Sequence, residues 1–76
     1  MVIIKCARCK RKLFKYEKIG KGRIWHCWEH RIKEDHSIHN GAEIRCSCGN
    51  LIGIVERKWI KMKQNAFEFS GTITKR

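Results

Sequence analysis

The chain has 76 residues and carries 18 Lys and Arg against seven Asp and Glu, which gives a formal net charge of +11. A chain of this length forms one domain, residues 1–76, and buries too little apolar surface to be stable without a further constraint. It has no apolar run long enough to span a membrane or to serve as a secretory signal, so the composition excludes a membrane protein and predicts a cytoplasmic one.

The N-terminal part of the sequence predicts β-strands. Residues 2–6 are rich in β-branched side chains, and residues 13–19 predict a second strand. Gly20 and Gly22 permit the positive φ of a tight hairpin turn, so residues 23–29 are expected to form the return strand. Apolar residues in and just after this last segment also have helical spacing, which leaves a helix as the alternative.

The C-terminal part continues the β pattern. A turn at residues 39–41 precedes a predicted strand over residues 42–46. Residues 50–62 predict one long strand that bends near Gly53. Apolar and polar residues alternate over residues 67–74, the period of a strand with one buried face. The sequence therefore predicts a mainly β, antiparallel fold.

The cysteines predict a metal site. Five cysteines in a short chain that lacks a secretory signal are more often metal ligands than disulfides. Cys6 and Cys9 form a Cys-x-x-Cys pair, and Cys46 and Cys48 form a Cys-x-Cys pair followed by Gly49, which permits a sharp turn around a metal. Four thiolates on two turns supply the tetrahedral coordination of Zn²⁺ and leave no position for water, so the zinc is expected to be structural. Disulfides and unliganded thiols are the alternatives.

Cys27 and four histidines remain outside this pattern. Cys27 either replaces a ligand of the second pair or is an ordinary buried thiol, and we expect burial. His26, His30, His36 and His39 supply enough imidazole for a second metal, but scattered surface histidines are the simpler expectation. Because none of these residues completes a catalytic motif such as His-Glu-x-x-His, the sequence does not predict an enzyme.

The paired cysteines, the stretch CSCGNLIG and the closing FEFSG resemble the β-tent superfamily of zinc domains over nearly the whole chain. This group includes Yippee-like proteins, the thalidomide-binding domain of cereblon, methionine sulfoxide reductase B and the RNA-binding C-terminal domain of innate immune RNA-sensing helicases. The resemblance implies two antiparallel sheets pinned at their apex by zinc on Cys6, Cys9, Cys46 and Cys48. A simple zinc ribbon, which shares paired knuckles, is the alternative. The second knuckle departs from the family pattern because only Ser47 separates its cysteines.

The net charge predicts an anionic partner, of which nucleic acid is the commonest. The RNA-sensing relatives bind RNA through a basic concave sheet face, so the resemblance implies the same class of ligand. Lysine and arginine bind phosphates, and an exposed aromatic ring can stack on an unpaired base, although each aromatic residue is individually expected in the core. The predicted nucleic-acid contacts are Arg8, Lys10, Arg11, Lys12, Lys15, Lys21, Arg23, Arg57, Lys58, Trp59, Lys61 and Lys63.

The leading prediction is a non-enzymatic zinc domain that binds RNA or DNA, mainly through phosphates, as a monomer or homodimer. The first alternative is an adaptor that docks an acidic protein, as Yippee-like relatives are thought to do. The second alternative is a thiol-dependent reductase that uses Cys27.

Overall fold

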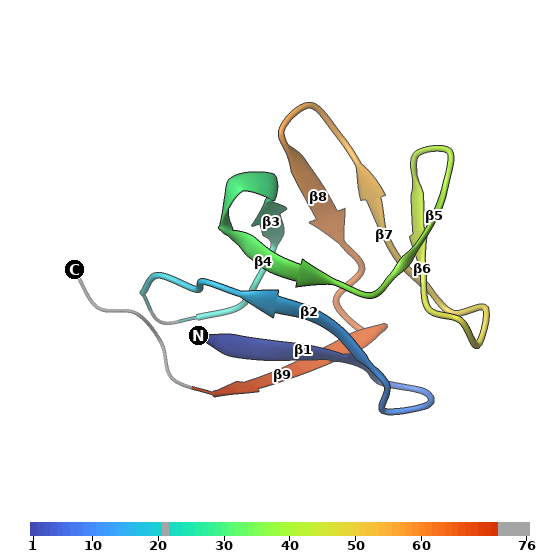
Figure 1. Cartoon of the computed structure of the whole chain (residues 1–76), viewed down its shortest axis with the longest axis horizontal. Helices are drawn as coiled ribbons and strands as arrows, with labels where there is room; N and C mark the ends of the chain where they lie inside the picture. Colours follow the sequence, from blue (N-terminus) through green and yellow to red (C-terminus); the bar gives the residue numbers. More distant parts are fainter. Residues whose placement is uncertain (21, 72–76) are drawn as a thin grey trace.

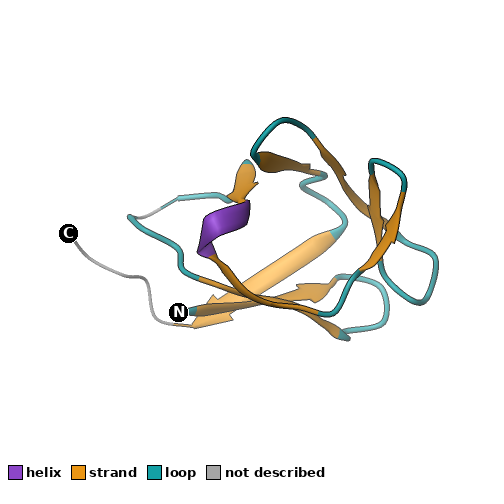
Figure 2. Ribbon diagram, turned by 45° about the horizontal axis from the view of Figure 1, so that its top comes forward, coloured by secondary structure: helices purple, strands orange, loops and turns teal. Residues whose placement is uncertain are grey.

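The computed structural model describes residues 1–20 and 22–71. These residues form nine strands and one short 3₁₀ helix, arranged as two antiparallel sheets that face each other across a shared core (Figures 1 and 2). The prediction of a mainly β chain with two antiparallel sheets is therefore confirmed. In the described part of the chain, no helix has the length and apolar character needed to cross a membrane.

The first sheet has four strands in the spatial order β4-β2-β1-β9. The buried residues of β1 alternate with more exposed ones, as expected for a strand with one face on a core. The last strand buries Phe67, which confirms the alternating pattern there, while the predicted extension through residues 72–74 lies outside the described residues. The bounds are β1 (Val2–Cys6), β2 (Lys12–Tyr16), β4 (Ile32–Asp35) and β9 (Phe67–Gly71).

The second sheet has five strands in the order β3-β8-β7-β6-β5. The 3₁₀ helix η1 (Glu29–Arg31) connects the edge strand of this sheet to β4, the edge strand of the other one. The bounds are β3 (His26–Trp28), β5 (Ile38–Asn40), β6 (Glu43–Arg45), β7 (Leu51–Val55) and β8 (Trp59–Met62).

The predicted hairpin between residues 13–19 and 23–29 is wrong. Strand β2 ends at Tyr16 and pairs with β1 and β4, so neither of its edges is open to the segment that follows. That segment crosses to the second sheet, forms a strand only at residues 26–28 and pairs with β8. Lys21, in the middle of the predicted turn, lies outside the described residues.

The single long strand predicted over residues 50–62 is also wrong. The segment forms an antiparallel hairpin of β7 and β8, whose turn is closed by the Glu56 N–H donating to the Trp59 carbonyl at 2.8 Å. Within β7, the register against β6 shifts beside Gly53, because Ile44 pairs with Gly53 and Arg45 pairs with Leu51. A Cβ on Gly53 would lie 2.6 Å from the Lys61 carbonyl oxygen, so its missing side chain allows β8 to approach closely.

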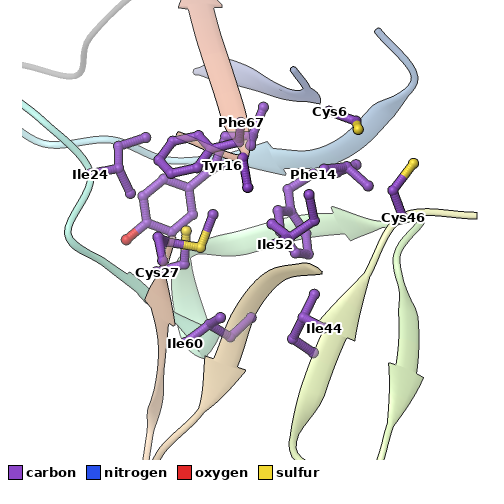
Figure 3. Close-up of a cluster of buried hydrophobic side chains, with 14 of the residues drawn as sticks. Cys6, Phe14, Tyr16, Ile24, Cys27, Ile44, Cys46, Ile52, Ile60 and Phe67 are labelled. Atoms are coloured by element: carbon purple, nitrogen blue, oxygen red, sulfur yellow. The ribbon is translucent and has the colours of Figure 1, made fainter. Parts of the chain in front are cut away.

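The core lies between the two sheets. Figure 3 shows aromatic side chains of the four-stranded sheet on one side and isoleucines of the five-stranded sheet on the other, with Cys6 and Cys46 at one end of the cluster. A hydrogen bond also crosses this space, because the Trp28 N–H on β3 donates to the Tyr16 hydroxyl on β2 at 3.0 Å. The labelled core residues are Phe14, Tyr16, Ile24, Cys27, Ile44, Ile52, Ile60 and Phe67.

Candidate metal centre

The first cysteine pair lies in the tight turn between β1 and β2. Cys6 ends β1, and its N–H donates to the Arg11 carbonyl at 2.9 Å, which closes the turn. The Lys10 N–H donates back to the Cys6 carbonyl at 2.9 Å. Lys10 has a φ of 64°, a left-handed conformation that reverses the chain directly after Cys9. The backbone therefore wraps around the two thiols.

The second cysteine pair lies in the turn between β6 and β7 and is built in the same way. The Cys46 N–H donates to the Asn50 carbonyl at 3.0 Å, and the Gly49 N–H donates to the Cys46 carbonyl at 2.9 Å. Gly49 has a φ of 95°, so the residue after Cys48 is left-handed here as well. The turn is one residue shorter than the first, and the sharper reversal needs a glycine.

The two turns bring all four thiols together (Figure 1, where the β1–β2 and β6–β7 loops lie at the same end). The four Sγ atoms lie within 4.8 Å of one another, with Cys6 to Cys48 at 3.7 Å and Cys9 to Cys46 at 3.3 Å. A zinc–sulfur bond of about 2.3 Å in a regular tetrahedron places sulfurs about 3.8 Å apart. All of these cysteines are free thiols. They are positioned to bind a metal ion, and the short Cys46–Cys48 spacing does not prevent it.

A second layer of contacts holds the turns in place. The Asn50 side-chain amide donates to the Cys6 sulfur at 3.5 Å and to the Ala66 carbonyl at 3.1 Å. The same carbonyl accepts the Ala7 N–H at 3.0 Å. Asn50 therefore links the second turn to the first and to the segment before β9, the kind of outer contact that orients metal ligands.

The environment separates the pKa values of the thiols. Burial raises the pKa of Cys6, but the Cys9 N–H, the Asn50 amide and a further backbone N–H outweigh it and lower the pKa to about 6. The Arg11 N–H lowers the pKa of Cys9, but the neighbouring thiols and burial raise it to about 11. Thiolates at this spacing repel one another, so a dication is required to ionise all four, and its binding releases protons.

Cys27 is not part of this cluster. Its side chain is fully buried between the sheets, as Figure 3 shows, which confirms the expected burial. Burial also raises the pKa of Cys27 to about 12. This thiol is therefore neutral near pH 7 and has neither the exposure nor the thiolate character that a reactive cysteine requires.

The histidines do not form a second metal site within residues 1–20 and 22–71, where the four cysteines are the sole converging group. His39 instead contacts Asp35 at 2.7 Å, and His36 contacts a neighbouring glutamate at 3.4 Å. His26 and His30 pack against tryptophans.

The basic residues near the first turn and on β2 are partly neutralised. Lys10 pairs with Glu68 at 3.0 Å, and Lys12 and Lys15 share Glu34 at 3.4 and 3.9 Å. Exposed pairs of this kind hold the cations only weakly, but they lower the local positive potential. The neighbouring Arg8 and Arg11 are exposed.

The basic residues of the β7–β8 hairpin are different. Arg57, Lys58, Lys61 and Lys63 are all exposed, and none of them makes an ion pair with another described residue. They surround Trp59, which is half-buried. Of the other predicted contacts, Arg23 is exposed in the segment before β3, and Lys21 lies outside the described residues.

Sequence reasoning missed Trp28 and His26 as part of this surface. They lie on β3 directly opposite Trp59 and Lys61 of β8, with the Trp28 and Trp59 ring centroids 5.3 Å apart. The alternation of His26 and Trp28 around the buried Cys27 is a signal of their exposure. The alternation does not indicate that β3 pairs with β8.

Comparisons of the chain with protein-family models, with curated proteins and with solved structures found no significant match.

Proposed function

We propose that this chain is a zinc-stabilised domain of the β-tent type that binds nucleic acid through phosphate contacts. The zinc assignment is supported by the four thiols of the cluster. Thiolates bind zinc and softer metals, whereas calcium and magnesium prefer oxygen ligands. The β-tent assignment is supported by two antiparallel sheets joined at their cysteine turns. With four protein ligands the metal has no open position, so its role is to hold the two sheets together.

The nucleic-acid assignment depends on one observation above all, the unpaired cations of the β7–β8 hairpin. A net charge of +11 attracts any polyanion, but most of that charge is spread over the surface. On the hairpin, Arg57, Lys58, Lys61 and Lys63 lie within seven residues of one another. Each is free, among the described residues, to bind a phosphate oxygen.

The test compares two triple variants of equal charge in a salt series with a fluorescent oligonucleotide. Lys58→Gln, Lys61→Gln and Lys63→Gln together should weaken binding and reduce the slope of log K against log salt by about two, because about 0.7 to 0.9 of a counterion is released per phosphate.

The matched control replaces Lys10, Lys12 and Lys15, which are already paired with Glu68 and Glu34. It removes the same formal charge and should reduce the slope less. If both triple variants reduce the slope equally, binding depends on net charge alone and not on the β7–β8 hairpin. Absence of binding by the unaltered chain at low salt would refute the proposed function.

An adaptor that docks an acidic protein is the second candidate. It is supported by exposed aliphatic side chains on the five-stranded sheet, Ile38 at 48% and Ile54 at 37% exposure. A stable homodimer or a complex with an acidic peptide, without affinity for oligonucleotides, would favour it. The reductase alternative is not proposed, because Cys27 is buried and neutral.

A further inference from the structure

The outward side of β3 and β8 carries an aromatic cluster. Trp28 and Trp59 face each other across the two strands with their ring planes at 60°, and His26 lies 5.6 Å from Trp59, also at 60°. The His30 ring centroid lies 6.2 Å from that of Trp28, with the ring planes at 54°. Cys27 and Ile60, the paired residues between them, are buried in the core. The cluster therefore lies on the solvent side of the sheet.

The cluster is held in position by its polar atoms. The backbone N–H of Trp28 donates to the buried Tyr16 hydroxyl, and this hydrogen bond links β3 to the opposite sheet. The Trp59 indole N–H donates to Glu56 at 3.2 Å, within the hairpin turn. The edge-to-face contact between Trp28 and Trp59 favours a fixed tilt of the two rings, and Trp28 keeps 36% of its surface exposed.

Two lysines lie beside the cluster, in addition to the Glu56 carboxylate that accepts the Trp59 indole N–H. Lys61 lies opposite His26 in the strand register, on the same side of the sheet and two residues from Trp59. Lys58 lies in the adjoining turn, and its carbonyl accepts the Glu29 N–H at 3.1 Å, which draws η1 against the hairpin. Neither lysine makes an ion pair within the described ranges.

We propose that this surface is a stacking platform for unpaired bases, so that the ligand class is single-stranded nucleic acid. The proposal rests on the proposed function and deepens it by naming the form of the ligand. Rings that present a face beside free lysines match the two parts of an unpaired nucleotide, a base and a phosphate. A duplex presents phosphates but keeps the faces of its bases inside the stack. Trp28, the more exposed ring, is the one that stacks.

The test measures affinity for three probes with the same number of phosphates: a single-stranded oligothymidine, a duplex and a strand with abasic linkers in place of the bases. The unaltered chain should bind the oligothymidine most tightly. Its affinity for the abasic strand should be lower by about 5- to 150-fold for each base that stacks.

Two variants of one residue separate stacking from apolar contact. Trp28→Leu keeps an apolar side chain but removes the ring. Its affinity for oligothymidine should be lower than that of the unaltered chain by the factor given above for one stacked base, and the slope of log K against log salt should not change. Trp28→Phe keeps a ring and should retain most of the affinity. Because Trp28 is partly exposed on an edge strand, both variants should keep their zinc content and their fold, with a lower melting temperature where the contact with Trp59 is lost, and this is measured first.

The results distinguish the two levels of the argument. If the chain binds none of the three probes, the proposed function fails. If it binds all three with equal affinity, or if Trp28→Leu binds oligothymidine as well as the unaltered chain does, then the stacking platform is refuted while phosphate binding stands. If an acidic peptide binds and the oligonucleotides do not, the surface serves a protein partner and both proposals are overturned.

Discussion

Removal of a metal from the four cysteines should strongly destabilise this domain. The four thiols lie between the first turn of one sheet and a turn of the other, so metal bound there stabilises only the folded state. At a free zinc concentration about 1,000 times the dissociation constant, this contributes about 4 kcal/mol to the free energy of unfolding. For a domain of this size each kcal/mol shifts the melting temperature by about 4 to 8 °C, so a chelator should lower it by about 15 to 30 °C.

The assay is thermal unfolding followed by circular dichroism, with and without a chelator, together with the zinc content of the purified protein. The expected content is one zinc per chain. Cys46→Ser, which alters a buried ligand, should abolish the stabilisation by zinc, and Cys9→Ser, at an exposed ligand, should weaken it.

Cys27→Ala is the matched control, because Cys27 is equally buried but lies outside the cluster. It should lower the melting temperature through a small cavity and leave the zinc content at one. A chain that is free of metal, fully folded and insensitive to the chelator would refute the reasoning.

Further predictions concern the turns that carry the ligands and the sheet behind them. Gly49→Ala places a side chain at a φ of 95° in open space, so strain alone should lower the free energy of unfolding by about 1 to 2 kcal/mol in thermal melts. Asn50→Ala removes one hydrogen bond to the Cys6 sulfur and one to the Ala66 carbonyl before β9, and it should weaken zinc affinity by about 10- to 100-fold in chelator competition. Gly53→Ala meets the backbone of β8 and should cost about 1 to 3 kcal/mol, measured by urea unfolding. Near pH 7 Cys9, with a pKa of about 11, carries a proton that zinc must displace, whereas Cys6, with a pKa of about 6, does not. Zinc affinity measured by competition should therefore fall on acidification, and more steeply below pH 6, where Cys6 is also protonated; affinity independent of pH would contradict thiolate ligation.

The sequence by itself determined the four cysteines of the candidate metal site. The spacing within each cysteine pair is short enough for the chain to turn around a metal locally, and Gly49 marks the sharper of the two turns. Local composition likewise indicated the strand over residues 2–6 and a strand over residues 42–46, which the structure forms at Glu43–Arg45, and local alternation indicated the burial of one face of β9. Each of these features depends on residues that are close together in the chain, so each can be predicted from the sequence without the tertiary structure.

Only the tertiary structure decided which strands lie side by side. Alternation shows that one face of a strand is buried, but it does not identify the neighbouring strand. The segment containing Trp28 was expected to return along residues 13–19, and it pairs with β8, about 30 residues away along the chain, because β1 and β4 occupy both edges of β2. This pairing sets Trp28 against Trp59 and creates an aromatic surface beside unpaired lysines. Each cysteine pair of the candidate metal site follows from local spacing, whereas the meeting of the two pairs follows from the tertiary structure. The proposed binding surface likewise follows from a long-range strand pairing that no local pattern specifies.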